Sequence, residues 1–445
     1  MRVGQMIYFL SCYFDEKFLF SNRLLTDTGL RFDMKGSSMG HQYIYCRSVF
    51  LLLMTGIFLT LACNRQSALE IHQNLFTVDS HVDTPLRLLR SDYNLAERHE
   101  ANQGKVDFVR MREGGLDAIF FAVFVGQREL TDKGYEKARK RALALFSAID
   151  SSLNRHPDLA SPALSPEDAY RLENEDKRAV FIGMENGYPL GKDLSLLTSF
   201  HDLGSRYITL CHTKHNQICD SSTDDSGPLH GGLSEFGRQV VAEMNRLGMM
   251  IDLSHASDQS FYDVVEISEA PVIASHSCAR AVCDHPRNLS DDMLLALKKN
   301  GGVIQMCILS AYVKKPPVDA KRDSAVTAFW QRNENYDEMT EEEQKRVWQE
   351  WRQLNRDYPE ALATVSDMAD HIDHIVSVAG IDHVGIGTDF DGGGGLKDCR
   401  DVSEMPAITR ELLRRGYSVD DLEKIWGENL MRVMREVQSP GGQNS

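Results

Sequence analysis

The sequence predicts an α/β protein that folds as a (β/α)₈, TIM-like barrel. Eight short apolar runs rich in β-branched residues alternate with longer amphipathic stretches, a pattern typical of βα units. Eight such units fit the number of residues that follow position 62. A doubly wound open sheet is the alternative, but no glycine-rich phosphate-binding turn follows the first run. The barrel is therefore the preferred prediction.

The eight predicted strands are distributed over most of the chain. They cover residues 76–80, 118–125, 179–184, 207–211, 249–253, 271–275, 302–308 and 384–388. The clearest helix between them lies at 234–248, where apolar residues recur at helical spacing and Gly248 provides a stop. We find no internal sequence repeat.

The segment between the seventh and eighth strands is too long for one crossover connection. Residues 314–362 are rich in charge and tryptophan, which predicts a helical insertion. A solvated helical addition is the preferred interpretation, and a lid or a dimer contact is the alternative. Residues 63–437 would thus form one barrel domain, and 438–445, rich in Gly, Ser and Gln, would form a flexible tail.

Residues 49–62 form an uncharged apolar run, with Arg47 before it and Cys63 after it. The run is too short to span a bilayer comfortably and predicts an export signal peptide. The ending from Thr60 to Cys63 resembles a bacterial lipobox, although the preferred leucine is one position further out. We expect an exported protein, periplasmic or in the cell envelope, lipid-anchored at Cys63. Residues 1–33 lack signal character, so residues 1–62 are expected to combine a mis-assigned start with the signal peptide.

Composition excludes one class of partner. The chain has 49 Lys and Arg against 65 Asp and Glu, a formal net charge of −16. Because no basic surplus exists to neutralise phosphates, a nucleic-acid partner is not expected. The cysteines beyond Cys63 show no spacing that defines a disulfide, so we expect them to be free, buried thiols.

Titratable side chains follow directly on most of the predicted strands. His81 and Asp83 lie two positions apart at the first strand, where an extended chain places both on one face. Other strands are followed or closed by Glu185, His212, His255, His276 and Asp389. A barrel carries its catalytic residues at the C-terminal ends of its strands. These side chains are therefore expected to meet at one mouth of the barrel.

These residue types suit a binuclear metal site. His81 and Asp83 on one side, with His255 and His276 on the other, can hold two divalent ions such as Zn²⁺. Glu185 has two carboxylate oxygens, enough to bridge ions about 3.5–4 Å apart.

Catalysis at such a site needs a nucleophile, a proton carrier and an oxyanion donor. Two cations lower the pKa of a water held between them, which gives a nucleophile near neutral pH. Asp389 would take a proton from that water and return it to the leaving amine. His212 would donate to the oxyanion. The expected chemistry is hydrolysis of an amide or ester.

The chain resembles the membrane (renal) dipeptidase family, zinc dipeptidases of the metallo-dependent hydrolase superfamily. The resemblance extends from about residue 75 to about residue 437. The motifs that carry it are VDSHVDTP, GMENG, GLSEFGRQVVAEMNRLGMMIDLSH, ASHSCARAVCDHPRNLSD and HVGIGTDFDGG.

This resemblance implies a dipeptidase with two zinc ions per chain, often a homodimer, that accepts dipeptides including those with a C-terminal D-residue. It places His81, Asp83 and Glu185 at one zinc, and His255 and His276 with the same glutamate at the other. It also implies substrate contact by His212, proton transfer by Asp389, a carboxylate anchor in Arg287 and a substrate-lining side chain in Tyr312.

Two other functions stay open. Another amidohydrolase on the same barrel would act on cyclic amides, lactones or β-lactams, because one barrel hosts many chemistries. Arg287 discriminates between the two enzymes, since a dipeptidase needs a carboxylate anchor. A non-catalytic lipoprotein that captures peptides would require a broken ligand set, and all five ligand positions are intact.

Overall fold

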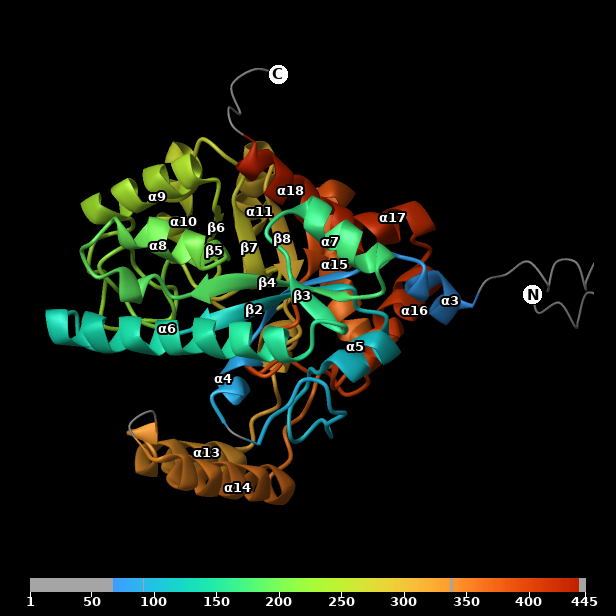
Figure 1. Cartoon of the computed structure of the whole chain (residues 1–445), viewed down its shortest axis with the longest axis horizontal. Helices are drawn as coiled ribbons and strands as arrows, with labels where there is room; N and C mark the ends of the chain where they lie inside the picture. The colour runs from blue at the N-terminus through green and yellow to red at the C-terminus, as the bar shows by residue number, and fades with distance from the viewer. Residues whose placement is uncertain (1–66, 91, 337–338, 440–445) are drawn as a thin grey trace, which may run out of the picture. The chain divides into compact units, whose positions relative to one another are not determined.

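A ring of eight parallel strands forms the centre of the computed structural model (Figure 1). The structure describes residues 67–90, 92–336 and 339–439. The ring runs in the order β1 (Val78–Val82), β2 (Ala118–Phe124), β4 (Arg178–Glu185), β5 (Ser205–Thr209), β6 (Met250–Asp252), β7 (Ile273–Ser277), β8 (Val303–Met306) and β9 (Val384–Ile386). All neighbouring strands in this order pair in parallel. The predicted barrel is confirmed.

One strand was not predicted. The short strand β3 (Ala160–Pro162) pairs with β4 outside the ring. Its three residues include a proline, and a segment this short has no apolar run that a sequence pattern could reveal.

The first and last strands of the ring meet through single contacts. Val82 and Phe390 form an isolated parallel bridge, and the Asp83 amide donates to the Phe390 carbonyl at 2.8 Å. Four residues before Asp83, the Asp79 carboxylate accepts a hydrogen bond from the Thr388 amide at 2.8 Å. These bonds nearly close the sheet into a barrel and leave little exposed strand edge.

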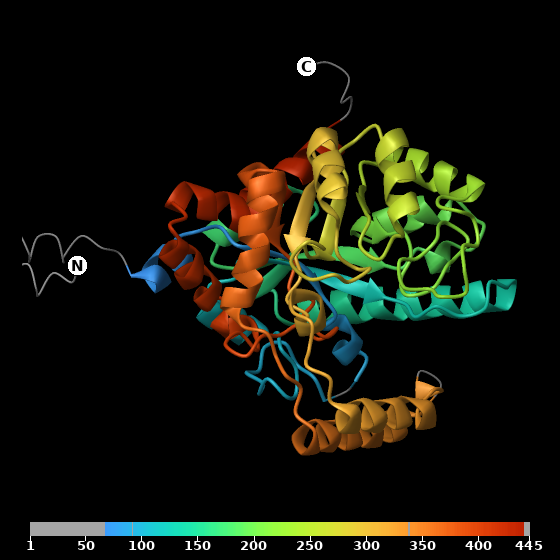
Figure 2. The same cartoon turned by 180° about the vertical axis from the view of Figure 1, so that it is seen from behind.

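Helices surround the ring on all sides that Figure 1 and Figure 2 show. They are α3 (Ala68–Gln73), α4 (Pro85–Leu88), α5 (Phe108–Gly114), α6 (Asp132–Arg155), α7 (Pro166–Asn174), α8 (Leu196–Asp202), α9 (Glu235–Leu247), α10 (Asp258–Ile267), α11 (Asp291–Asn300), α15 (Val365–Val378), α16 (Pro406–Arg415), α17 (Val419–Glu423) and α18 (Asn429–Gln438). In α9, the Ser234 side chain caps the first turn, and Gly248 ends the helix with φ 71°, as its sequence predicted.

Helix α18 covers the N-terminal end of the barrel. Its buried residues Leu430, Met431 and Met434 belong to one apolar cluster with Val78 and Met250, which begin their strands. With this end filled by side chains, the opposite, C-terminal end of the strands is the one available to a substrate.

The predicted helical insertion lies between β8 and β9. The short helix α12 (Ser310–Val313) precedes the predicted range 314–362. That range contains α13 (Ala320–Arg332) and α14 (Glu341–Asp357), which form a hairpin at the lower edge of Figure 1 and Figure 2. Phe329 of α13 packs on Trp351 of α14 with ring centroids 5.1 Å apart. Aromatic packing thus joins the two helices of the hairpin.

Several expectations concern the chain ends. The signal peptide in 1–62, the lipidated Cys63 and residues 440–445 of the predicted tail lie outside the described residues. Within the described ranges, no helix is both long enough and apolar enough to cross a membrane. All six cysteines of the described chain are free and buried, as expected.

Arg110 joins segments that are far apart in the sequence. Its guanidinium is fully buried and lies 2.6 Å from the Asp107 carboxylate and 3.0 Å from that of Asp401, which follows β9. It also donates to the Gly104 carbonyl at 2.6 Å. A buried charge with this many partners is costly to break, because its partners would stay buried and unpaired.

We therefore expect Arg110→Met to lower the free energy of unfolding by about 3–5 kcal/mol in urea denaturation. Arg112→Met is the matched control, two residues along the same helix, where the Arg112 side chain is 54% exposed and its partner Asp176 is 72% exposed. That control should change stability little. Equal losses in the two variants would contradict the assigned role of Arg110.

Candidate active site

Glu185, the last residue of β4, lies at the centre of a cluster of polar side chains at the C-terminal end of the barrel. Its Oε2 atom is 3.4 Å from His81 Nε2. Its Oε1 atom is 3.1 Å from His255 Nε2 and 3.5 Å from His276 Nε2. The two oxygens of one carboxylate thus face two different groups of potential ligands.

The first group belongs to the seam between β1 and β9. His81 Nε2 lies 3.6 Å from Asp83 Oδ2, and both side chains offer ligand atoms within 4.8 Å of an Asp389 oxygen. The Asp389 amide donates to the His81 carbonyl at 2.9 Å, so the seam itself holds the three residues together.

The second group comes from β7 and from the segments that follow β5 and β6. His255 Nε2 and His276 Nε2 are 3.0 Å apart. His212 Nε2 lies 3.6 Å from Glu185 Oε1, and its ring packs 4.7 Å from that of Phe124. Two imidazole nitrogens and a carboxylate oxygen at these separations form a donor set that suits Zn²⁺.

The hydrogen bonds of the His81 ring identify its tautomer. The Tyr207 hydroxyl donates to the Ser80 carbonyl at 3.1 Å, so it accepts from His81 Nδ1–H at 2.8 Å. In the neutral ring, the Nε2 atom of His81 then carries the lone pair, on the side of the carboxylates. Inside the barrel, only glycine fits at Gly183, because a Cβ there would lie 2.0 Å from Tyr207 Cζ.

A second chain of hydrogen bonds orients His276. The Ser275 hydroxyl donates to Asp252 Oδ2 at 2.6 Å, so it accepts from His276 Nδ1–H at 2.8 Å. This leaves His276 Nε2 with its lone pair toward Glu185. Such outer partners fix the ring orientation of metal-binding histidines and increase their basicity.

Burial and neighbouring charges shift the pKa values of the cluster in different directions. Burial, with the nearby Arg287, lowers the pKa of His212 to about 3 and also lowers the pKa of His255. Burial raises the pKa of Asp389 well above its usual value, assisted by Cys307. The two histidines are therefore neutral near pH 7, and Asp389 can hold a proton.

His81 behaves differently. Burial alone would lower its pKa, but Tyr207 and the Glu185 carboxylate raise the pKa of His81 above its ordinary value. Burial and Glu185 also raise the pKa of Asp83. The carboxylates thus stabilise a positive charge at this point. That charge can be a proton on His81 or a bound divalent cation.

Several residues at the mouth of the barrel have a left-handed backbone conformation. Asn186, His255, Asp389 and Asp391 have φ values of 79°, 72°, 60° and 67°. This left-handed region costs a non-glycine residue about 1–2 kcal/mol. Each of these residues lies just beyond the end of a barrel strand, so the strain occurs at the mouth and not in the ring.

Arg287 and Tyr312, the two remaining predicted site residues, lie together. The Arg287 guanidinium is 5.3 Å from the centre of the Tyr312 ring, and Nη2 donates to the His276 carbonyl at 3.1 Å. Arg287 is buried, and its Nε has no hydrogen-bond partner. Burial raises the pKa of Tyr312 to about 12, so this phenol is neutral.

Sequence reasoning missed three contributors to this arrangement: Tyr207, Ser275 and Gly392. A Cβ at Gly392 would lie 2.1 Å from Asp83 Oδ2 and 2.2 Å from Asp389 Oδ1. The glycine therefore allows the two carboxylates to approach each other. In the sequence, only the position of Gly392 in the run of glycines after Asp391 indicates this role. Neither Tyr207 nor Ser275 is distinguishable from an ordinary strand residue by type or spacing.

Comparisons with known proteins identify the family of this chain. The sequence model of "Membrane dipeptidase (Peptidase family M19)" matches residues 65–444. Dipeptidase aclJ of Aspergillus oryzae is 35% identical over 346 residues, 76% of this chain and 72% of the relative. Dipeptidase 3 of Rattus norvegicus is 35% identical over 385 residues, 84% of this chain and 67% of the relative.

A solved structure extends the agreement to three dimensions. The probable dipeptidase PvdM from Pseudomonas aeruginosa superposes with a TM-score of 0.72 at 32% identity, covering 83% of this chain and 97% of that chain. The chain belongs to the membrane dipeptidase family, peptidase family M19.

Proposed function

We propose that this dipeptidase hydrolyses the peptide bond of dipeptides at a binuclear zinc site. The observation that carries the proposal is the division of the Glu185 carboxylate, with Oε2 at 3.4 Å from His81 and Oε1 at 3.1 Å from His255. His81 and Asp83 would hold one ion, and His255 and His276 the other. When bound, two such ions supply a nucleophile at neutral pH and stabilise developing negative charge.

Asp389 is proposed as the proton carrier. Its raised pKa allows this carboxyl group to hold a proton near neutral pH and to release it to the leaving amine. The neutral imidazole of His212 would donate a hydrogen bond to the oxyanion of the scissile carbonyl. His212 lies beside Glu185, and Asp389 lies beside His81 and Asp83. Both side chains therefore border the point where the scissile carbonyl would be held.

Arg287 is proposed to bind the C-terminal carboxylate of the substrate. Its guanidinium is held against the Tyr312 ring, and its buried Nε still has a hydrogen to donate. A guanidinium matches a carboxylate with two parallel hydrogen bonds. Because this anchor and the scissile carbonyl fix only two points, we propose that the C-terminal side chain is loosely restrained and that D-residues are accepted there.

Localisation and assembly are further parts of the proposal. The apolar run 49–62 and Cys63 support export to the periplasm or cell envelope with a lipid anchor. Mass spectrometry of the processed N-terminus would test this, and an unprocessed Met1 would contradict it. The aromatic hairpin of α13 and α14 is one candidate contact in a homodimer.

The most direct test is a dipeptide panel that includes C-terminal D-residues, assayed with and without chelator. We expect hydrolysis, loss of activity with chelator, recovery with Zn²⁺, and two ions per chain by elemental analysis. Absence of amino-acid release from zinc-loaded protein would contradict the proposal. Fewer than two ions per chain under zinc-replete conditions would favour a non-catalytic peptide-binding protein.

The role of Asp389 predicts a specific kinetic change. Asp389→Asn should lower kcat by at least about a hundredfold with little change in KM, because an amide cannot carry the proton. Steady-state kinetics on one dipeptide measures this. Asp225→Asn, on an exposed residue of the loop after β5, is the control and should keep the wild-type kcat. A loss expressed in KM alone would contradict proton transfer by Asp389.

The role of Arg287 predicts a change in substrate selection. The wild-type protein should prefer a dipeptide with a free carboxylate over its C-terminal amide, and Arg287→Ala should remove that preference with a rise in KM. The expected loss in kcat/KM is about 10²–10³-fold on the free dipeptide, because a buried charge-assisted pair is lost. Undiminished activity of this variant would favour a different amidohydrolase, acting on cyclic amides, lactones or β-lactams.

A further inference from the structure

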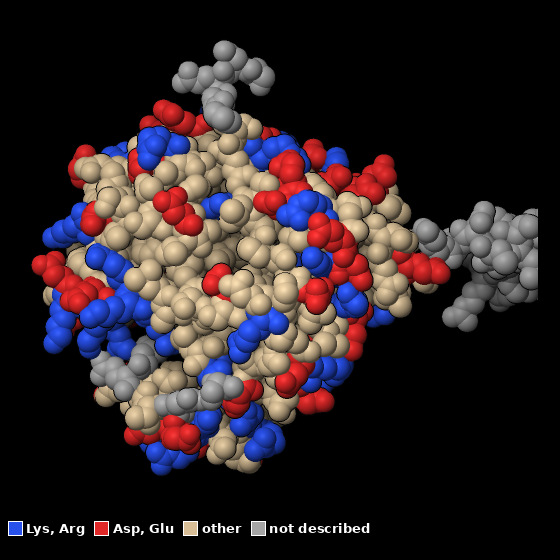
Figure 3. Space-filling view, viewed as in Figure 1, with Lys and Arg blue, Asp and Glu red and all other residues tan. Residues whose placement is uncertain are grey.

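Asp391 is a buried carboxylate that the proposed mechanism does not use. Figure 3 shows charged side chains of both signs over one face of the molecule, where exposed charges contribute little to a particular arrangement. The Asp391 side chain is instead 1% exposed. A buried charge is costly unless several donors compensate it, so the donors around Asp391 indicate its role.

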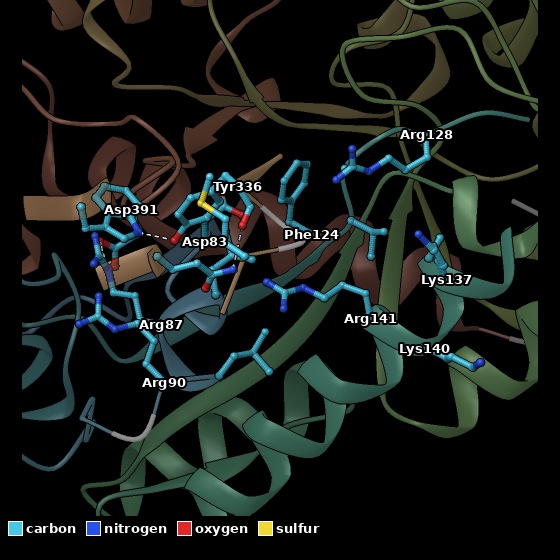
Figure 4. Close-up of a pocket in the computed structure, with 18 residues that line it drawn as sticks. Asp83, Arg87, Arg90, Phe124, Arg128, Lys137, Lys140, Arg141, Tyr336 and Asp391 are labelled. Atoms are coloured by element: carbon cyan, nitrogen blue, oxygen red, sulfur yellow. Dashed lines mark hydrogen bonds and ion pairs between the residues drawn. The ribbon is translucent and has the colours of Figure 1, made fainter. Parts of the chain in front are cut away.

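The Asp391 carboxylate accepts hydrogen bonds from three residues of the chain between β1 and β2. The Thr84 hydroxyl donates to Oδ2 at 2.7 Å, the Arg87 Nε to Oδ1 at 2.8 Å, and the Lys105 amide to Oδ1 at 3.0 Å. Figure 4 shows Asp391 beside Arg87 at one end of a cavity of about 670 Å³, which Asp83 also lines. Both oxygens of Asp391 are thus occupied by donors from the β1 side of the seam.

The turn that carries Asp391 is held by its own backbone. The amides of Gly392, Gly393 and Gly394 donate to the Asp389 carbonyl at 3.1, 3.1 and 2.7 Å. Asp391 itself has φ 67°, a left-handed conformation that aspartate adopts more readily than most residues. The turn is therefore a fixed base from which the Asp391 side chain extends to the segment after β1.

The proposed ligand Asp83 depends on that segment for its position. Its Oδ1 atom is buried and has no hydrogen-bond partner among the described residues, and its Oδ2 atom lies 3.6 Å from His81 Nε2. A carboxylate with a free oxygen suits a cation, but it has no donor of its own to fix its orientation. The backbone on either side of Asp83 must therefore fix it.

Thr84, the next residue, connects Asp83 to Asp391. It occupies the N-cap position of α4, where a threonine side chain commonly caps its own helix, but it makes no such bond. Its hydroxyl donates to Asp391 instead. Because Thr84 is fully buried, this hydrogen bond fixes the residue adjacent to the ligand.

We propose that Asp391 is a positioning residue that holds Asp83 in place to bind the first metal ion. The inference rests on the proposed function, because it assumes that His81 and Asp83 bind an ion. Asp391 is not itself a proposed ligand, since the described ligand atoms within 4.8 Å of one another at this point belong to His81, Asp83 and Asp389. Residues that orient a ligand contribute about 10–100-fold to metal affinity.

Cobalt titration followed by visible absorption tests the proposal, because reference variants identify each ion. Asp83→Ala removes a proposed ligand of the first ion, and His276→Ala removes one of the second. In Asp391→Gly, the absorption that Asp83→Ala abolishes should require about 10–100-fold more cobalt than in the wild-type protein. The absorption that His276→Ala abolishes should keep its wild-type midpoint. Glycine adopts φ 67° without strain, so this variant adds no backbone strain.

Two further variants separate loss of the carboxylate from the flexibility of glycine. Asp391→Asn keeps an acceptor for Arg87 and a side chain suited to left-handed backbone, so it should recover most of the lost affinity. Thr84→Val removes only the hydroxyl and should weaken the first ion alone, by less than Asp391→Gly. In the double variant, Thr84→Val should add no further loss, because its partner is already absent. If Asp391→Gly does not fold, an unshifted first midpoint in Thr84→Val would overturn the inference.

The matched control is Arg178→Met, which breaks a largely buried ion pair at the opposite end of the barrel. Arg178 begins β4 and lies 2.9 Å from the Asp117 carboxylate. This variant should lower stability in urea denaturation and keep both cobalt midpoints. A shift of the first midpoint as large as in Asp391→Gly would overturn the inference, because the effect would then be a general loss of stability. Equal shifts of both midpoints in Asp391→Gly, or none, would also overturn it.

Failure of the proposed function has a different signature. Wild-type protein that binds two cobalt ions but, when loaded with zinc, releases no amino acids from dipeptides would contradict the proposed function alone. A selective shift of the first midpoint in Asp391→Gly would still support the inference in that case. Wild-type protein that lacks the first absorption would overturn both.

Discussion

The hydrogen bonds between β1 and the segment after β9 are the contact on which the site depends. The Asp389 amide donates to the His81 carbonyl, and the Asp83 amide donates to the Phe390 carbonyl. These bonds join residues about three hundred positions apart, and they place two proposed ligands beside the proposed proton carrier. Without this seam the sheet would have two open edges, and Asp389 would lie at the opposite edge from His81 and Asp83.

Within the closed ring, the polar interior of the barrel prepares the histidines for a cation. The Tyr207 hydroxyl, and the Ser275 hydroxyl that donates to Asp252, each accept a hydrogen bond from the Nδ1–H on the far side of an imidazole ring. Both networks are buried and belong to the strands themselves. The orientation of the rings therefore depends on the barrel and not on the loops around the mouth.

Much of the fold and of the site could be predicted from the sequence, because apolar runs and the residues that end them are local signals. The predicted strand at 76–80 and the observed β1, Val78–Val82, differ by two residues, since His81 continues the strand into the mouth. The prediction for β9 extended to 388, but the strand ends at Ile386. There the chain leaves the ladder to form the seam with β1.

The remaining features depend on contacts between distant segments. Tyr207 resembles any strand tyrosine until its hydroxyl is seen beside His81. Ser275 likewise resembles an ordinary strand residue until its hydroxyl is seen between Asp252 and the His276 ring. Residue type and spacing along one strand do not record what another strand places opposite it.

The left-handed residues at the mouth have a consequence for engineering. His255 and Asp389 occupy backbone conformations that glycine would adopt with less strain, yet their side chains are the proposed ligand and proton carrier. A search for stabilising substitutions guided by backbone geometry would select these positions first. At these two positions, thermostability and turnover are therefore competing objectives, and a stabilised variant should be designed in the helical shell with the mouth held constant.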